Sequence, residues 1–182
     1  MNQLTKDQII LTNWDKKFLQ VALLTATWSK DPRRKVGCCI VDPKTNIQLS
    51  GGYNGLPRGI KDSDERLQNR ELKLKIIVHA EANSITAAAR KGHSIEGATM
   101  YSSLNPCASC ASLIIQAGIE RLVYIEDPSS TSWKEDHQLA KELLTEAGVE
   151  MVSARIEHNY NFDIKNSGYE EIPSNFILSS QQ

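Results

Sequence analysis

Three residue types at two short spacings could together hold a metal ion and move a proton. The segment "HAEANSI" places His79 two residues before Glu81, and "NPCASC" places Cys107 and Cys110 three residues apart behind a proline. Imidazole nitrogen and thiolate sulfur form a ligand set that suits zinc. Three protein ligands leave the fourth position of a tetrahedral zinc to water, as in catalytic zinc sites. The pattern therefore predicts His79, Cys107 and Cys110 as ligands of a catalytic metal.

Glu81 has the chemistry of a proton carrier beside such an ion. Zinc lowers the pKa of a bound water to about 7, so a neighbouring carboxylate could accept its proton and later protonate a ring nitrogen and a leaving amine. Because helical residues turn by about 100° each, His79 and Glu81 can meet only off the helix end. H-x-E followed by P-C-x-x-C is the pattern of zinc nucleobase deaminases. A structural zinc site completed by another chain, or a site without metal, is the alternative.

The remaining cysteines and histidines are weaker ligand candidates. Cys38 and Cys39 fall in a predicted buried strand, where free cysteines commonly serve as small hydrophobic residues. His93, His137 and His158 stand alone in polar segments and are expected to be solvated. A CxxC pair in a reducing compartment indicates metal binding rather than a disulfide.

Length and composition fit one globular domain. The chain has 182 residues, of which 40% are hydrophobic and 24% charged, values that are ordinary for a soluble fold. We expect a single deaminase-type domain over residues 1–182, with a core at about 12–155 and a C-terminal tail at 156–182. No apolar run reaches the ~20 residues of a membrane span and no secretory signal opens the chain, so we expect a cytoplasmic protein with no membrane partner.

A formal net charge of −1 gives the chain no general attraction for nucleic acid or anionic membranes. An anionic substrate must therefore be bound by a local group of cations.

Hydrophobic periodicity predicts a helix-covered sheet. The segment "TNWD" is a capping box that opens a helix ending near Ser29. Its predicted buried stripe contains six residues at helical spacing: Trp14, Phe18, Val21, Ala22, Thr25 and Trp28. Residues 36–42 and 46–54 are predicted to form a hairpin. The long polar segment 54–76 is expected to be functional, with a short helix near 64–72.

The rest of the chain alternates helices with strands. Predicted helices cover 78–92, closed by Gly92, then 105–118, with Asn105 as N-cap and Pro106 in the first helical position, and 132–148, opened by a second capping box. Predicted strands cover 97–103, 119–126 and 149–155, of which the last two are expected to be parallel neighbours. The fold class is thus α/β, with three layers and a central mixed sheet of about five strands covered by helices.

Four segments give the chain a family resemblance: "SKDPRRKVG" at 29–37, "GYNGLPRG" at 52–59, "HAEANSI" at 79–85 and "GATMYSSLNPCASCASLIIQAGIERLVY" at 97–124. From Trp14 to about Ala154 the chain resembles the deoxycytidylate (dCMP) deaminases of the cytidine deaminase superfamily. The resemblance implies the cytidine deaminase-like fold and the zinc-dependent hydrolysis of dCMP to dUMP and ammonia, which supplies dUMP for thymidylate synthesis.

The resemblance also implies substrate contacts. Asn54 would hydrogen-bond the nucleotide, and the backbone N–H of Ala80 would meet the base carbonyl. Ser29, Arg33 and Lys35 fall where the family has its phosphate-side loop. A monophosphate needs cations and polar donors within reach. Four cations fall near the predicted pocket, although each alone could be a solvated surface charge: Arg33, Arg34, Lys35 and Arg58.

Many members of this family are hexamers that dCTP activates and dTTP inhibits, with the GYNG region contributing to the effector site. This implies a homohexamer with effector or interface roles for Gly52, Tyr53, Gly55 and Arg90, and Mg²⁺ accompanying a nucleotide triphosphate effector. For Arg90, an exposed cation at a helix end is the alternative. The chain lacks the additional Cys/His set of relatives with a second zinc, so one zinc per subunit is expected.

Two other function classes fit parts of the pattern. A deaminase acting on tRNA or single-stranded DNA would favour a basic stripe with stacking aromatic residues. This chain is near neutral and 6% aromatic, and "GYNG" and "IIQAGI" favour the dCMP branch. A zinc-stabilised binding module without catalysis is the second alternative, in which Glu81 would have no chemical role.

Overall fold

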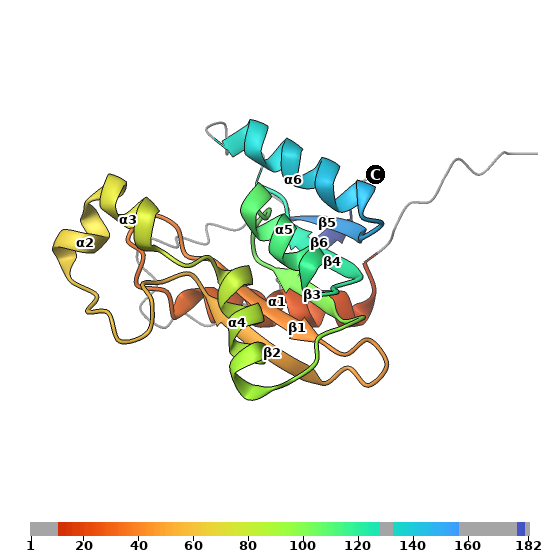
Figure 1. Cartoon of the computed structure of the whole chain (residues 1–182). Coiled ribbons are helices and arrows are strands. Elements are labelled where there is room, and N and C mark those ends of the chain that lie inside the picture. The colour runs from red at the N-terminus through yellow and green to blue at the C-terminus, as the bar shows by residue number, and fades with distance from the viewer. Residues whose placement is uncertain (1–10, 128–132, 157–177, 181–182) are drawn as a thin grey trace, which may run out of the picture.

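A mixed six-stranded sheet forms the middle layer of the protein, with α1 on one face and α4, α5 and α6 on the other (Figure 1). The computed structural model describes residues 11–127, 133–156 and 178–180. The strands lie in the order β2-β1-β3-β4-β5-β6. Their bounds are β1 Gly37–Val41, β2 Gln48–Tyr53, β3 Thr99–Ser102, β4 Arg121–Ile125, β5 Glu150–Ile156 and β6 Leu178–Ser180.

The helices follow the predicted alternation with the strands. They are α1 Asn13–Thr27, α2 Asp64–Gln68, α3 Arg70–Ile76, α4 Ala80–Lys91, α5 Ala108–Gln116 and α6 Lys134–Glu146. The short helix expected near 64–72 is two helices, α2 and α3, which extend from one side of the sheet (Figure 1). No helix in the described part of the chain combines the length and apolar character needed to cross a membrane.

Alternating side chains of β1 divide the core into two layers. Cys38 and Ile40 belong to the core cluster that also contains residues of α4, α5 and α6, whereas Cys39 and Val41 belong to the cluster that contains residues of α1. All four are at most 1% exposed, as expected for a strand covered on both faces. The predicted three-layer arrangement is therefore confirmed.

The pairing of the strands confirms two predictions and extends a third. β1 and β2 form the expected antiparallel hairpin, and β4 and β5 are parallel neighbours. The sheet has six strands rather than about five, because β6 in the C-terminal tail pairs antiparallel with β5. At β6, the tail thus packs on its own chain. The boundary of the predicted core, near residue 155, lies inside the last long strand.

The capping box of α1 is confirmed, but its predicted buried stripe is only partly correct. Thr12 Oγ1 accepts from Asp15 N at 3.0 Å, and Thr12 N donates to the Asp15 carboxylate at 2.9 Å. Trp14 and Trp28 are 47% and 58% exposed. The face against the sheet is centred on four residues at i, i+3, i+4 and i+7 spacing, which leaves both tryptophans at its edge: Leu19, Ala22, Leu23 and Ala26.

Asp15 is also the centre of a buried charge network. Its carboxylate accepts two hydrogen bonds from Arg121, at 2.6 and 3.1 Å, and one from Tyr101 at 2.9 Å, while Arg121 also pairs with Glu150. Burial acts to raise the pKa of Asp15, but the bonds from Arg121 and Thr12 outweigh it, so this pKa lies below its ordinary 3.8. The network ties the start of α1 to β3 and β4.

Replacing Asp15 by Asn should destabilise the protein by about 3 kcal/mol at pH 7, because the Arg121 guanidinium loses its buried charged partner and keeps only the half-exposed Glu150. A carboxylate with a lowered pKa stabilises the fold fully above pH 3.8 and loses this effect as the pH falls through its folded pKa. The difference between wild type and Asp15→Asn in urea unfolding should therefore shrink below pH 3.8.

Glu150→Gln is the matched control, since Glu150 binds the same arginine but is half exposed. Glu150→Gln should lower the free energy of unfolding by less than about 1 kcal/mol. Equal costs for the two substitutions would contradict this account of Asp15.

Candidate active site

The first turns of α4 and α5 meet at one point. His79 is the N-cap of α4 and Cys107 the N-cap of α5, both with extended backbone, and Cys110 lies in the first turn of α5. His79 Nδ1 lies 3.4 Å from the sulfur of Cys107 and 3.4 Å from that of Cys110. The structure thus brings the three predicted metal ligands together.

The spacing of these donor atoms fits a zinc ion. With Zn–S of about 2.3 Å and Zn–N of about 2.05 Å, tetrahedral geometry separates nitrogen from sulfur by about 3.5 Å. The two observed separations are 3.4 Å. In the described part of the chain, these side chains form the one group of three or more His, Cys, Asp or Glu whose ligand atoms all lie within 4.8 Å of one another.

The start of α5 differs from the prediction. Asn105 was expected to cap the helix, but its Oδ1 accepts from the backbone N–H of Asp127, beyond the end of β4. The cap is Cys107, whose Sγ accepts from Cys110 N at 3.4 Å, so Pro106 precedes the helix. A sulfur that carries negative charge can serve as the cap acceptor, because it faces the positive end of the helix dipole.

The electrostatics of the cysteine pair favour one thiolate. Hydrogen bonds from Cys110 and then from His79 lower the pKa of Cys107 to about 4, against the effect of burial. The pKa of Cys110 is raised because it donates to Cys107 and is buried. The hydrogen bond to Cys107 also raises the pKa of His79. A metal ion would replace the shared proton of these donors.

Glu81 lies against the metal ligands. It is the second residue of α4 and only 3% exposed. Its Oε1 accepts from Ser102 Oγ at 3.2 Å, and its Oε2 lies 3.6 Å from the sulfur of Cys110. Burial raises the pKa of Glu81. A buried carboxyl group with a raised pKa, fixed beside a metal site, is suited to accept and return a proton.

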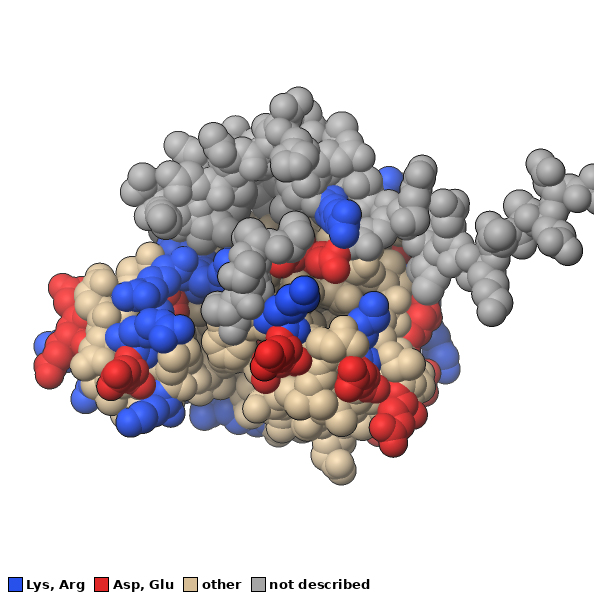
Figure 2. Space-filling view, turned by 90° about the horizontal axis from the view of Figure 1, so that it is seen from above, with Lys and Arg blue, Asp and Glu red and all other residues tan. Residues whose placement is uncertain are grey.

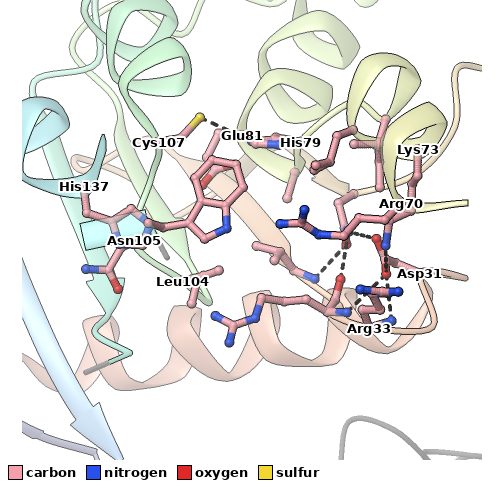
Figure 3. A pocket seen from close by; sticks show the side chains of 17 residues that line it. Asp31, Arg33, Arg70, Lys73, His79, Glu81, Leu104, Asn105, Cys107 and His137 are labelled. Atoms are coloured by element: carbon pink, nitrogen blue, oxygen red, sulfur yellow. Dashed lines mark hydrogen bonds and ion pairs between the residues drawn. The ribbon is translucent and has the colours of Figure 1, made fainter. Parts of the chain in front are cut away.

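A cavity of about 320 Å³ opens over these residues, near the lower end of the ~300–1,000 Å³ of small-ligand sites. Figure 3 shows His79, Glu81 and Cys107 on one part of its wall and Arg33, Arg70 and Lys73 on another. Seven of the residues predicted from the sequence line it: Arg33, Arg34, Asn54, His79, Ala80, Glu81 and Cys107.

The other predicted phosphate-side residues do not line the cavity. Ser29 is 2% exposed, and its hydroxyl donates to Asn54 O and accepts from Asp31 N. Lys35 is half-buried outside the cavity wall, and the exposed Arg58 also lies outside it. Ser29 therefore supports the wall from behind, whereas Arg33 reaches the cavity.

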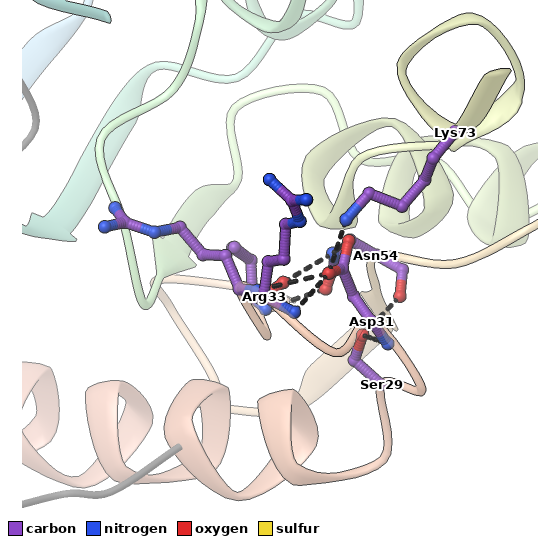
Figure 4. A network of polar contacts seen from close by, with 7 residues as sticks. Ser29, Asp31, Arg33, Asn54 and Lys73 are labelled. Atoms are coloured by element: carbon purple, nitrogen blue, oxygen red, sulfur yellow. Dashed lines mark hydrogen bonds and ion pairs between the residues drawn. The ribbon is translucent and has the colours of Figure 1, made fainter. Parts of the chain in front are cut away.

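Asp31 is the centre of the network behind this wall (Figure 4). Its Oδ1 accepts from the backbone N–H groups of Arg33 and Arg34 and from Lys73 Nζ at 2.7 Å. Asn54 donates to its Oδ2 at 3.5 Å and to Arg34 O at 2.9 Å, while Asn54 Oδ1 accepts from Val36 N. The network holds the loop after α1 in a fixed shape.

The predicted effector and interface residues lie elsewhere. Gly52 packs so closely on α4 that a Cβ there would lie 2.8 Å from Ser84 N, which explains the glycine. Gly55 forms an isolated bridge with Val78. Tyr53 is 39% exposed and meets Trp28 edge-on. Arg90 is exposed in the last turn of α4. None of the four lines the cavity.

Sequence reasoning missed one wall of the cavity. It expected residues 54–76 to be functional, with a short helix near 64–72, but it assigned no site residue to that helix. Four residues at i, i+3, i+4 and i+7 spacing, on and just after α3, line the cavity: Arg70, Lys73, Leu74 and Ile77. This spacing was a usable signal. It was hidden because two of the four residues are charged and the helix is short.

The prediction for His137, on the opposite wall of the cavity, was wrong. It was expected to be solvated, but it is half-buried, lines the cavity and stacks on Trp133 with 6.4 Å between the ring centroids. Burial lowers its pKa. His93 is exposed as expected, and Cys38 and Cys39 are buried core residues. His158 and Ser132, the expected cap of α6, lie outside the described residues; the helix begins at Lys134.

The family model described as the cytidine and deoxycytidylate deaminase zinc-binding region matches residues 12–126. The chain belongs to this family.

Named relatives of this deaminase cover most of its length. It is 37% identical over 141 residues to the deoxycytidylate deaminase of Homo sapiens, covering 75% of this chain and 76% of that protein. It is 38% identical over 148 residues to a probable deoxycytidylate deaminase of Drosophila melanogaster, covering 76% and 70%. The cyanophage S-TIM5 dCMP deaminase, solved in complex with dCMP and dUMP, matches with a TM-score of 0.61 and 25% identity, covering 79% of this chain and 98% of that one.

Cys107→Ser removes a metal ligand and should therefore lower the zinc affinity of the deaminase. The loss should exceed the about 10- to 100-fold that follows when a residue that only hydrogen-bonds a ligand is removed. Zinc per chain, measured by elemental analysis after dialysis against a chelator, should fall from about one to well below it.

Cys39→Ser is the matched control. Cys39 is also buried, and its Sγ contacts Phe18 O at 3.6 Å, a contact that a serine hydroxyl can also make. This variant should keep its zinc. Equal zinc in both variants would show that the sulfur of Cys107 does not bind the ion.

Proposed function

We propose that this deaminase hydrolyses dCMP to dUMP and ammonia. The observation that carries the proposal is a single cavity that contains the His79, Glu81 and Cys107 side chains together with several cations. Such a cavity suits a substrate with a base that can be deaminated and a phosphate. Relatives named deoxycytidylate deaminase, and a solved relative with dCMP and dUMP bound, support the same substrate.

The metal ligands and Glu81 have separate roles in this reaction. His79, Cys107 and Cys110 hold zinc, which supplies Lewis acidity that makes water a usable nucleophile near neutral pH. Glu81 accepts a proton from the attacking water and delivers protons to the ring nitrogen and the departing amine. The C4–N bond breaks, a C4–O bond forms, and ammonia leaves. Ser102 holds Oε1 of Glu81, which leaves Oε2 toward the metal side.

Substrate contacts follow from the wall of the cavity. The backbone N–H of Ala80, the first residue of α4, is proposed to meet the base carbonyl. Asn54 is proposed to contact the sugar side, using the amide hydrogen whose bond to Asp31 is long, at 3.5 Å. Ser29 would act on the substrate only indirectly, by holding Asn54 and Asp31. Lys35 would contact the substrate only after its side chain turned toward the cavity.

Further proposals rest on the family resemblance. They are a single domain over residues 1–182, a cytoplasmic homohexamer, activation by dCTP and inhibition by dTTP with Mg²⁺, and the supply of dUMP for thymidylate synthesis. Gly52, Tyr53, Gly55 and Arg90 are proposed for the effector or subunit contacts. None of these four side chains lines the cavity, which is compatible with a separate effector site.

Glu81→Gln should lower kcat for dCMP by about 10²–10⁴-fold or more, because the amide cannot accept the proton of water. Zinc content should be unchanged, because Glu81 is not a ligand. The measurements are ammonia release and zinc per chain on the same protein. The matched control is Glu71→Gln, an exposed acid on α3, which should keep full activity.

A substrate panel separates the proposal from its alternatives. Wild-type protein is assayed with dCMP, deoxycytidine, cytidine and a tRNA anticodon stem. Turnover of the RNA with none of dCMP would overturn the proposal in favour of a nucleic-acid deaminase. Full activity in Glu81→Gln, or no turnover of any base by the zinc-loaded protein, would favour a binding module.

A further inference from the structure

We propose that Arg70 on α3 contacts the 5′-phosphate of the substrate and determines the preference for a nucleotide over a nucleoside. This inference rests on the proposed function, and it assigns a role to the segment between β2 and α4 that neither the motifs nor the comparisons assign.

Among the described residues, four Lys or Arg side chains line the cavity, of which two are paired with a carboxylate and two are not. Lys73 and Asp31 form an ion pair at 2.7 Å, with side chains 5% and 4% exposed. Arg34 pairs with Asp127 at 2.5 Å. Within the described part of the chain, no hydrogen bond or ion pair engages the side chains of Arg33 and Arg70. An anion entering the cavity would therefore be bound by these last two.

The direction of Arg70 follows from the geometry of α3. Residues three apart on a helix lie on one face, and Lys73, three residues after Arg70, points to the buried Asp31. Leu74 and Ile77 continue the same face, and all four residues line the cavity. The guanidinium of Arg70 is thus presented to the cavity, although the residue itself is exposed.

The buried ion pair also sets the position of Arg70 relative to Arg33. Asp31 Oδ1 accepts both from Lys73 Nζ and from the backbone N–H of Arg33. One carboxylate therefore connects α3 to the loop after α1. Figure 3 shows Arg33 and Arg70 reaching the cavity from these two different elements. A partner that is held in place before binding loses less freedom when the ligand arrives.

The chemistry of a phosphate monoester matches this pair. The group is close to a dianion at pH 7 and presents three strong acceptor oxygens. A guanidinium can donate two parallel hydrogen bonds to such oxygens. On the face shown in Figure 2, Lys and Arg side chains lie on the side of α2 and α3 together with Asp and Glu side chains. A nucleoside has no group that could use Arg70.

The test compares three variants in the zinc-loaded, full-length protein: Arg70→Gln, Arg70→Lys and the control Lys75→Gln. Lys75 lies on the same helix, is exposed and is outside the cavity wall, so its substitution makes the same change of charge without the proposed contact. The readouts are kcat and KM for dCMP and for deoxycytidine, and the Kd of dUMP and of deoxyuridine by calorimetry.

Arg70→Gln should lower kcat/KM for dCMP about 10- to 100-fold, mainly through KM, because a charge-assisted contact to the phosphate is lost. The Kd of dUMP should rise by a similar factor. Values for deoxycytidine and deoxyuridine should stay within about twofold, since these ligands lack the phosphate. Arg70→Lys should fall between Arg70→Gln and wild type, and Lys75→Gln should match wild type.

Two results would overturn the inference while leaving the proposed function intact. In one, wild type prefers dCMP and Arg70→Gln keeps that preference, so Arg70 is a solvated surface cation. In the other, Arg70→Gln loses activity on dCMP and deoxycytidine equally, so the residue supports the fold of the cavity. A wild-type enzyme that does not prefer dCMP to deoxycytidine would instead refute dCMP as its substrate, whatever the variants do.

Discussion

The convergence of two helix starts is the constraint on which the rest of the site depends. At an N-cap the backbone is extended, so the side chain projects off the helix end instead of along its side. His79 and Cys107 both occupy this position. Their helices, α4 and α5, pack on the same face of the sheet through one shared core. Because that core fixes both helix starts, the ligands and Glu81 can hold a metal without relying on flexible loops.

Different physics positions the two walls of the cavity. The metal wall is built on helices with buried apolar faces, such as Ala88 of α4 and Ile114 of α5. The cationic wall combines Arg33, from the loop after α1, with Arg70 and Lys73 of α3. The buried side chains of α2 and α3 are Leu67 and Lys73. Short helices with so little apolar burial need another anchor, and the Lys73–Asp31 pair supplies one. Breaking a buried pair by removing one partner is strongly destabilising, so this pair specifies where α3 can dock.

Local signals in the sequence predicted the elements well where the physics is local. The Thr12–Asp15 capping box, the Gly92 terminus of α4 and the buried strand predicted at 36–42 each depend on a few adjacent residues, and all three are present. The failures occur where a distant group competes for the same side chain. Asn105 could have capped α5, but the backbone of Asp127 uses its oxygen. Trp14 and Trp28 fit the periodicity of α1, yet the sheet packs against the adjacent stripe of the helix and leaves both tryptophans exposed.

The sequence by itself determined the chemistry of the site: which residues can bind zinc, which can carry a proton, and that each motif opens a helix. The reason is that ligand type and helix-start signals are properties of short segments. Tertiary structure alone decided the composition of the cavity, because Arg70 and His137 are brought to one space from chain positions 67 residues apart. It also decided which cations remain available, because only packing shows that Asp31 neutralises Lys73 and that Asp127 neutralises Arg34.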